Sequence, residues 1–266
     1  MFIQATDSEA STPSGAAFRS AAPEYATDLL DNRSREHLDR AAQLVARGEI
    51  VAFGFNGIFA LIGDVDQPIA ARRMAQAKGQ SRDETLALVC PPECLGQFID
   101  TCSAVVAHHG LNRLQRLQSA LHGLGVILPK AKHLVPSYAT ENGTVLNVWF
   151  EYAPARYLYR QLRRHGVRAL IGTSANKHGD ATCVDPLHAL RVFGGSIPAV
   201  VAHDLHDVLE QRRQSSTLVD FTAKRPRLAR HGSVTVHELR SQLRVQGMED
   251  LCLEMPVSST AAIVLH

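Results

Sequence analysis

Short apolar segments alternate with amphipathic segments along most of the chain. Apolar runs bounded by Gly, Pro or polar residues predict buried strands, and apolar positions that recur every three or four residues predict helices. We expect strands at residues 49–53, 58–62, 85–89, 125–128, 145–150, 169–171, 199–202 and 216–221. We expect helices at residues 38–45, 67–77, 93–98, 103–121, 153–165, 186–193 and 236–243. Strands and helices mix without strict alternation, which predicts an α/β fold with one twisted, mixed sheet flanked by helices.

The connections and the two ends are polar or lack periodicity. Residues 54–57 and 228–232 are predicted turns, and residues 78–84 a polar loop. Residues 1–33 are rich in Ala, Ser, Thr and Pro, so we expect a flexible N-terminal arm there. We therefore assign residues 34–245 to a single domain and residues 246–266 to a C-terminal extension.

Charge and cysteine content favour a cytoplasmic protein. Lys and Arg number 28 against 26 Asp and Glu, so nothing in the net charge of +2 requires a nucleic-acid partner. The five cysteines are an odd number in a chain with no signal-peptide pattern, which favours reduced thiols. No apolar run approaches the roughly 18 residues that a membrane span requires, so we expect no membrane association.

Basic residues cluster in two places, and such a face could bind phosphates or RNA. The alternative for the first cluster is a solvated helix face. The two clusters are Arg156, Arg160, Arg163, Arg164 and Arg168, and then Arg212, Arg213, Lys224, Arg225, Arg227 and Arg230.

The segment 168–179 has the pattern of a ligand-binding strand exit. The apolar run 169–171 ends at Gly172 and is followed by small polar residues, including Ser174 and Asn176. Ligands of open α/β sheets lie at the carboxyl ends of strands, where such side chains can donate hydrogen bonds. The alternative is an ordinary strand exit with a capping Asn.

Two further motifs follow this segment, and the order of the three motifs resembles that of the YrdC/YciO family. The resemblance spans roughly residues 38–243. Its most specific marks are TSAN at 173–176 followed by Gly179, STLVD at 216–220, and RHG at 230–232. The stretches 48–53, 75–79 and 125–129 agree with the family in spacing. The resemblance implies a single YrdC-like domain with a concave basic cleft.

The family resemblance also implies an enzyme, a nucleotidyltransferase of the threonylcarbamoyl-AMP synthase type. ATP, bicarbonate and L-threonine would give threonylcarbamoyl-AMP and pyrophosphate, for the modification of an adenosine in certain tRNAs. By resemblance, Lys78 and Arg230 would be catalytic cations on the phosphates, and Ser174, Asn176 and Ser216 would bind the nucleotide with them. Magnesium would accompany the triphosphate, with no dedicated protein ligands. The alternatives are a surface lysine that ends a helix for Lys78 and a surface arginine for Arg230.

The chain departs from the family around the amino-acid substrate. Residues 54–61 lack both threonines and the acid of the family segment, and an arginine is replaced by Gln80. Arg82 lies two residues further on and could substitute for it. A buried polar partner that loses its match costs about 1–3 kcal/mol, so tight threonine binding of the usual kind is not expected. We expect this altered pocket to be lined by Phe55, Asn56, Gln80, Arg82, Val126, Trp149 and Thr173. Plain core packing is the alternative for Phe55 and Trp149.

Three functions remain open from the sequence. The first is the carbamoyl-adenylate-forming enzyme described above. The second is a carbamoyl-transfer enzyme of specialised metabolism with a non-threonine acceptor, and the third is a non-catalytic module that binds a nucleotide or double-stranded RNA. Cys90 and Cys94 lack a second pair of zinc-ligand spacing, and no convincing Ser-His-Asp arrangement is present, so we expect no protein-held metal and no hydrolase triad.

Overall fold

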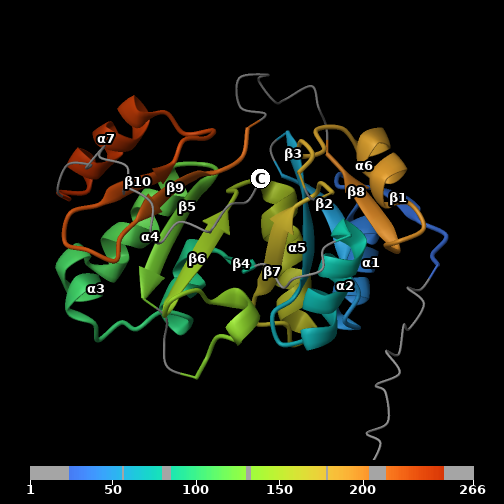
Figure 1. Ribbon diagram of the computed structural model, residues 1–266, viewed down its shortest axis with the longest axis horizontal. Helices are drawn as coiled ribbons and strands as arrows, with labels where there is room; N and C mark the ends of the chain where they lie inside the picture. The colour runs from blue at the N-terminus through green and yellow to red at the C-terminus, as the bar shows by residue number, and fades with distance from the viewer. Residues whose placement is uncertain are drawn as a thin grey trace, which may run out of the picture.

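The centre of the molecule is a ten-stranded mixed sheet with strand order β1-β8-β2-β3-β7-β4-β6-β5-β9-β10 (Figure 1). The computed structural model describes residues 24–55, 57–79, 85–129, 133–177, 179–203 and 214–248. Its strands are β1 (Asp28–Asp31), β2 (Val51–Phe55), β3 (Ile58–Asp64), β4 (Ala87–Val89), β5 (Leu124–Pro129), β6 (Thr144–Trp149), β7 (Leu170–Ser174), β8 (Ala199–Ala202), β9 (Thr217–Asp220) and β10 (Arg227–Arg230). The predicted α/β class and the twisted, mixed sheet are confirmed.

Helices pack on both halves of this sheet. They are α1 (Arg35–Ala46), α2 (Pro68–Lys78), α3 (Ala104–His109), α4 (Leu111–Ala120), α5 (Ala153–Arg164), α6 (Pro186–Phe193) and α7 (Val236–Val245), with 3₁₀ turns η1 (Pro92–Gln97) and η2 (Ser137–Ala139). In Figure 1, α3, α4 and α7 lie with β5, β9 and β10, whereas α1, α2 and α6 lie at the opposite end with β1, β2 and β8.

The helix ends follow their capping residues. Ser34 begins α1 by accepting a hydrogen bond from the His37 amide, and Thr235 and Glu238 form a capping box at the start of α7. The single helix predicted over 103–121 is wrong: Gly110, with φ +77°, divides it into α3 and α4.

The two faces of the sheet differ in what covers them, and β6 shows the difference. Side chains alternate between faces along a strand. Asn147 is fully buried, and its Nδ2 donates to Gln118 Oε1 of α4 at 2.9 Å. Trp149 packs edge-on against Tyr159 of α5. Val148, between them, points to the other face. At β6, the face of Asn147 and Trp149 is therefore helix-covered core, and Val148 on the other face borders a pocket.

Three sequence-based expectations need correction. A strand, β1, lies inside the predicted N-terminal arm, where Asp28–Asp31 pairs in parallel with Ala199–Ala202. The predicted turn at 54–57 begins too early, because Gly54 and Phe55 still pair with Phe59 and Ile58. The predicted turn at 228–232 contains most of β10, which pairs antiparallel with β9. In β1 and β10 charged residues flank the apolar ones, which hides a short edge strand from a hydrophobicity pattern.

No helix within the described ranges is both long and apolar enough to cross a membrane.

Candidate active site

A pocket lies on the face of the sheet to which Val148 belongs, and its empty space of about 520 Å³ includes open solvent. Residues from β2, β3, β4, β6, β7 and the segment before β9 converge on it. The described residues that line it are Phe55, Ile58, Phe59, Ala60, Ala87, Val89, Val148, Phe150, Gly172, Thr173, Ser174, Ser215, Ser216 and Arg230. Arg230 is the one charged residue in this described lining, so a basic cleft stays a prediction.

One side of the pocket is formed by the end of β7, which Lys78 holds in place. Lys78 is the last residue of α2 and is only 4% exposed. Its Nζ donates to Thr173 Oγ1 at 3.1 Å, to the Ser174 carbonyl at 3.2 Å and to Asn176 Oδ1 at 3.4 Å. The structure therefore brings Lys78 and the TSAN segment together, with the ammonium group behind the loop rather than in the described pocket lining.

Asn176 folds the loop that follows β7. Its Nδ2 donates to the carbonyls of Lys177 at 3.0 Å and Asp180 at 2.8 Å, and its Oδ1 accepts from the Ser174 hydroxyl at 2.6 Å. Asn176 is 2% exposed, so its side chain is committed to the loop. Of the TSAN residues, Thr173 and Ser174 line the pocket.

Lys177 also contributes to this side of the site, and sequence reasoning missed it. Its Nζ donates to the Ala77 carbonyl at 2.5 Å and lies over the Phe193 ring of α6. A lysine at a helix C-terminus satisfies a carbonyl that has no partner in the helix. Its position directly after TSAN is the available sequence signal.

The other side of the pocket is formed by Arg230 and the segment before β9. The Arg230 Nε and Nη2 donate to the Ser216 carbonyl at 3.1 and 2.9 Å. Burial lowers the pKa of Arg230 from its ordinary value. A partly desolvated guanidinium that faces a pocket favours an anionic ligand, because the anion replaces lost hydration.

Gly232 explains why the RHG motif ends in glycine. A Cβ at this position would lie 2.1 Å from the Ser215 carbonyl oxygen and 2.6 Å from the Thr217 amide nitrogen. Only a residue without a side chain lets this loop cross Ser215–Thr217 so closely. The RHG motif thus fixes the position of the backbone that carries Arg230 relative to Ser216.

An aromatic wall closes a third side. The Phe55 and Phe150 rings stack with centroids 5.2 Å apart, and both are almost fully buried. Phe59 also borders the pocket, but its ring stacks on His203, whose close approach requires Gly54. Phe150 comes directly after β6. The sequence did not predict it as a pocket residue, although it continues the alternation that begins with Val148.

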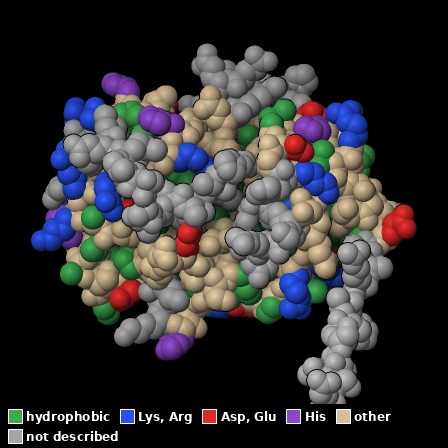
Figure 2. All heavy atoms as spheres, in the orientation of Figure 1, with side chains coloured by type: hydrophobic (Ala, Val, Ile, Leu, Met, Phe, Trp, Pro, Cys, Tyr) green, Lys and Arg blue, Asp and Glu red, His purple; other side chains and the backbone are tan. Residues whose placement is uncertain are grey.

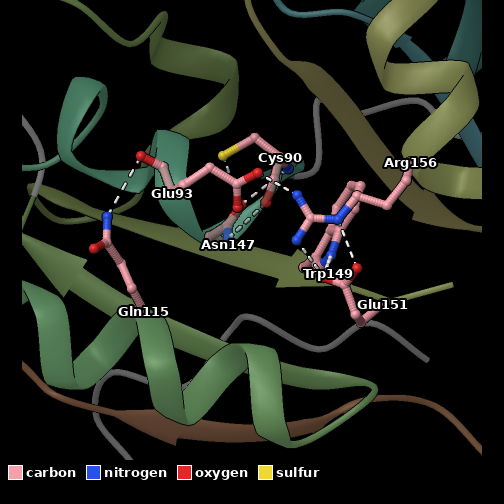
Figure 3. A network of polar contacts seen from close by, with 7 residues as sticks. All are labelled: Cys90, Glu93, Gln115, Asn147, Trp149, Glu151 and Arg156. Atoms are coloured by element: carbon pink, nitrogen blue, oxygen red, sulfur yellow. Dashed lines mark hydrogen bonds and ion pairs between the residues drawn. The ribbon is translucent and has the colours of Figure 1, made fainter. Parts of the chain in front are cut away.

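Val126 and Trp149, which we expected to line the substrate pocket, lie on the opposite face of the sheet and outside the described lining. Val126 pairs with Asn147 in the helix-covered layer. Figure 3 shows Trp149 beneath the Arg156 guanidinium, and its Nε1 donates to Glu151 Oε2 at 2.8 Å. Core packing, the alternative reading of Trp149, is what the structure shows. Asn56, Gln80 and Arg82 lie outside the described residues.

The first basic cluster is partly neutralised by acidic partners. Arg156 forms ion pairs with Glu93 and Glu151 (Figure 3). Arg168 pairs with Asp66 at 2.6 Å. This leaves Arg160, Arg163 and Arg164 exposed on or at the end of α5, consistent with a solvated helix face. Arg212 and Arg213 of the second cluster lie outside the described residues.

The donor set of the described residues does not suit a protein-held metal. No group of three or more His, Cys, Asp or Glu residues that could hold an ion occurs within the described ranges. The described pocket lining contains no carboxylate, which is the ligand type that Mg²⁺ prefers. Magnesium bound to a triphosphate would therefore rely on phosphate oxygens and water, and no step below depends on it.

Comparison with known proteins identifies the fold and the family. The family described as "Telomere recombination" (Sua5, YciO and YrdC) matches residues 43–232. Sua5 from P. abyssi in complex with L-threonine superposes with a TM-score of 0.68 at 20% identity, covering 84% of this chain and 62% of that one. E. coli YciO superposes with a TM-score of 0.64 at 15% identity, covering 80% of this chain and 99% of that one.

HypF in its phosphate- and nucleotide-bound form shares the fold over a smaller part, with a TM-score of 0.59, 19% identity, and coverage of 73% of this chain and 29% of that one. No curated protein matches the sequence significantly. The chain spans less than two thirds of the Sua5 chain that is bound to threonine. Because the family match extends over most of the described domain, the chain belongs to the Sua5/YciO/YrdC family.

Proposed function

We propose that this chain is a threonylcarbamoyl-AMP synthase-like enzyme with an altered amino-acid pocket. It would use ATP, bicarbonate and an amino acid to form a carbamoyl-type adenylate and pyrophosphate. The observation that carries the proposal is the convergence, in one pocket, of the β7 loop with Arg230 and Ser216. Family membership and the fold shared with threonine-bound Sua5 and nucleotide-bound HypF support it.

The chemistry assigns a role to each group. The amine of the amino acid forms a C–N bond to the bicarbonate carbon with loss of water, which gives a carbamate. A carbamate oxygen then bonds to the α-phosphorus while the bond to the β-phosphate oxygen breaks and pyrophosphate leaves. Arg230 would stabilise the negative charge that develops on the phosphates, and Ser174 and Ser216 would donate hydrogen bonds to them. Lys78 would act as a positioning residue that keeps the β7 loop in register.

The test is release of pyrophosphate from ATP and bicarbonate in the presence of magnesium and all twenty amino acids. We expect Arg230→Gln to reduce the rate about 100-fold or more, since it removes a cation from the reacting phosphates. Arg227→Gln is the matched control. It lies on the same strand but pairs with Asp220 at 3.0 Å, outside the described pocket lining, and should change the rate less than threefold. No pyrophosphate release, together with no thermal stabilisation by ATP, would refute the proposal.

A second candidate function, RNA binding, is favoured by one surface. Lys and Arg side chains gather near α7 and β10 in the space-filling view (Figure 2). Arg113 and Arg116 of α4 bond to Gly247 and Gln246 just after α7, which places the arginines of both helices on one surface. The exposed Arg244 and Lys224 extend it.

Fluorescence anisotropy with a short RNA duplex at two salt concentrations tests this surface. Phosphate contacts would make the affinity fall with salt, and Arg244→Gln should weaken binding and reduce the salt slope. Arg33→Gln is the control, because Arg33 lies at the other end of the sheet beside β1. Equal effects of the two variants would refute a specific surface at α7.

A further inference from the structure

The pocket lining combines polar and apolar residues. Its polar members are Arg230, Thr173, Ser174, Ser215 and Ser216. Its apolar members include Phe55 and Phe150, together with Ile58, Val89 and Val148. Phe55 is 2% exposed and Phe150 is 6% exposed, so both rings are embedded in the wall and cannot swing out of it without leaving the core.

The two phenylalanines of the lining are held in place by ring packing. Phe55 is held between Phe53, at a ring distance of 4.7 Å, and Phe150, at 5.2 Å. The Tyr152 ring also contacts this group, and its hydroxyl donates to the Gly54 carbonyl at 2.5 Å.

This arrangement determines which acceptor side chain fits. A hydroxyl placed against Phe55 and Val148 would lose hydrogen bonds to water and would meet only the carbon atoms of those two side chains. A methyl or aryl group in the same place would bury apolar surface, which is favourable. L-Threonine and L-valine have nearly the same shape and differ in this one group, so they form a direct comparison.

We infer that the acceptor amino acid has an apolar side chain, which binds against Phe55, Val148 and Phe150, while its reacting end faces Arg230 and the serines. The inference rests on the proposed adenylate-forming activity and specifies its substrate class. Two valines of β6 allow a matched test of this inference. Val148 borders the pocket, whereas Val145 lies on the opposite face of the strand, in the helix-covered core.

The experiment measures kcat/KM for pyrophosphate release with L-threonine, L-valine and L-phenylalanine separately. We expect valine or phenylalanine to exceed threonine by about tenfold or more, the usual effect of one mismatched group in an apolar pocket. Val148→Thr adds a hydroxyl to the wall without changing its shape and should lower the apolar-to-threonine ratio about tenfold. Val145→Thr, the same change on the opposite face, should leave the ratio unchanged even if it lowers stability.

The outcomes separate the inference from the function on which it rests. A wild-type preference for threonine, or equal shifts of the ratio in both variants, would overturn the inference and leave the adenylate-forming activity in place. Absence of pyrophosphate release with every amino acid would overturn both. Phe55→Thr gives a second reading of the same ratio if Val148→Thr fails to fold.

Discussion

Replacing Gly232 by alanine tests whether the RHG motif acts through backbone proximity. The backbone of Gly232 does not adopt a positive φ, so alanine is conformationally acceptable and the whole effect comes from the added carbon. That carbon would lie 2.1 Å from the Ser215 carbonyl oxygen, more than 1 Å inside ordinary contact. The three nearest atoms all belong to the main chain of Ser215–Thr217, so no side-chain rotation relieves the overlap. The loop that contains Gly232 must therefore move away from Ser215–Thr217.

Separation breaks the hydrogen bonds that join these segments. Ser233 N donates to the Ser215 carbonyl at 2.9 Å, and the Thr217 hydroxyl bonds to both the carbonyl and the amide of Val234. Three buried neutral bonds contribute about 1 kcal/mol each, and the Arg230 bonds to Ser216 add about 1.5–3 kcal/mol if they are lost as well. We therefore expect the free energy of unfolding to fall by about 3–6 kcal/mol.

Urea unfolding followed by tryptophan fluorescence measures this change, because Trp149, the chain's one tryptophan, is buried in the core. Gly166→Ala is the matched control: Gly166 has φ +85° and open space around it, so alanine there should cost only the left-handed backbone penalty of about 1–2 kcal/mol. A Gly232→Ala protein that loses no more stability than Gly166→Ala would refute the reasoning.

Three further predictions concern the buried polar groups. Asn147→Ala should lower the free energy of unfolding by about 2–4 kcal/mol, since it leaves the Cys90 amide and Gln118 without their partner in the core. Gln115→Ala, on the outside of α4, the helix that contains Gln118, should cost less than about 1 kcal/mol. Burial raises the pKa of Glu151, but hydrogen bonds from Arg156 and Trp149 outweigh this effect and hold the pKa below its usual value. The ionised Glu151 therefore stabilises the fold above a pH of about 4.3. This contribution is lost as the pH falls through the lowered pKa. The stability difference between wild type and Glu151→Gln should therefore shrink in urea titrations at decreasing pH, and a constant difference would contradict the assignment. Tyr138→Phe removes a 2.6 Å hydrogen bond to the Val65 carbonyl and should cost about 1 kcal/mol by the same assay.

The sequence predicts the segments of the sheet more reliably than it predicts their faces. Residues 145–150 were expected to be a strand and 125–128 another, and both are present as β6 and β5. Yet the pocket residues chosen from them, Trp149 and Val126, are each one position away from the residues on the pocket face, Phe150 and Gly125. A one-residue shift reverses the face. Both strands are buried on both sides, so hydrophobicity carries no signal for which face is open.

The motif order identified residues that lie together at the end of β7, because these residues hold the backbone of that loop. Lys78 and Asn176 were expected near one another, and they share hydrogen bonds at the end of β7. Their contacts are mostly to carbonyls and neighbouring side chains of the loop, so the residue types identify the loop. The apolar side depends instead on the packing of β2 against the end of β6, which lie far apart in the sequence.

The place of β8 in the sheet determines when the molecule can assemble. Ala199 pairs with Asp28 on one side and with Val51 on the other, so the two N-terminal strands are joined only through a strand that follows more than 140 residues later. Pairing across such long separations slows folding, because loop closure precedes the gain from contacts. During synthesis on the ribosome, β1 and β2 would emerge early. The edges of both strands that pair with β8 would stay unpaired until β8 is synthesised. A chain shortened before residue 199 would lack the strand that joins them, and we expect it to aggregate rather than fold.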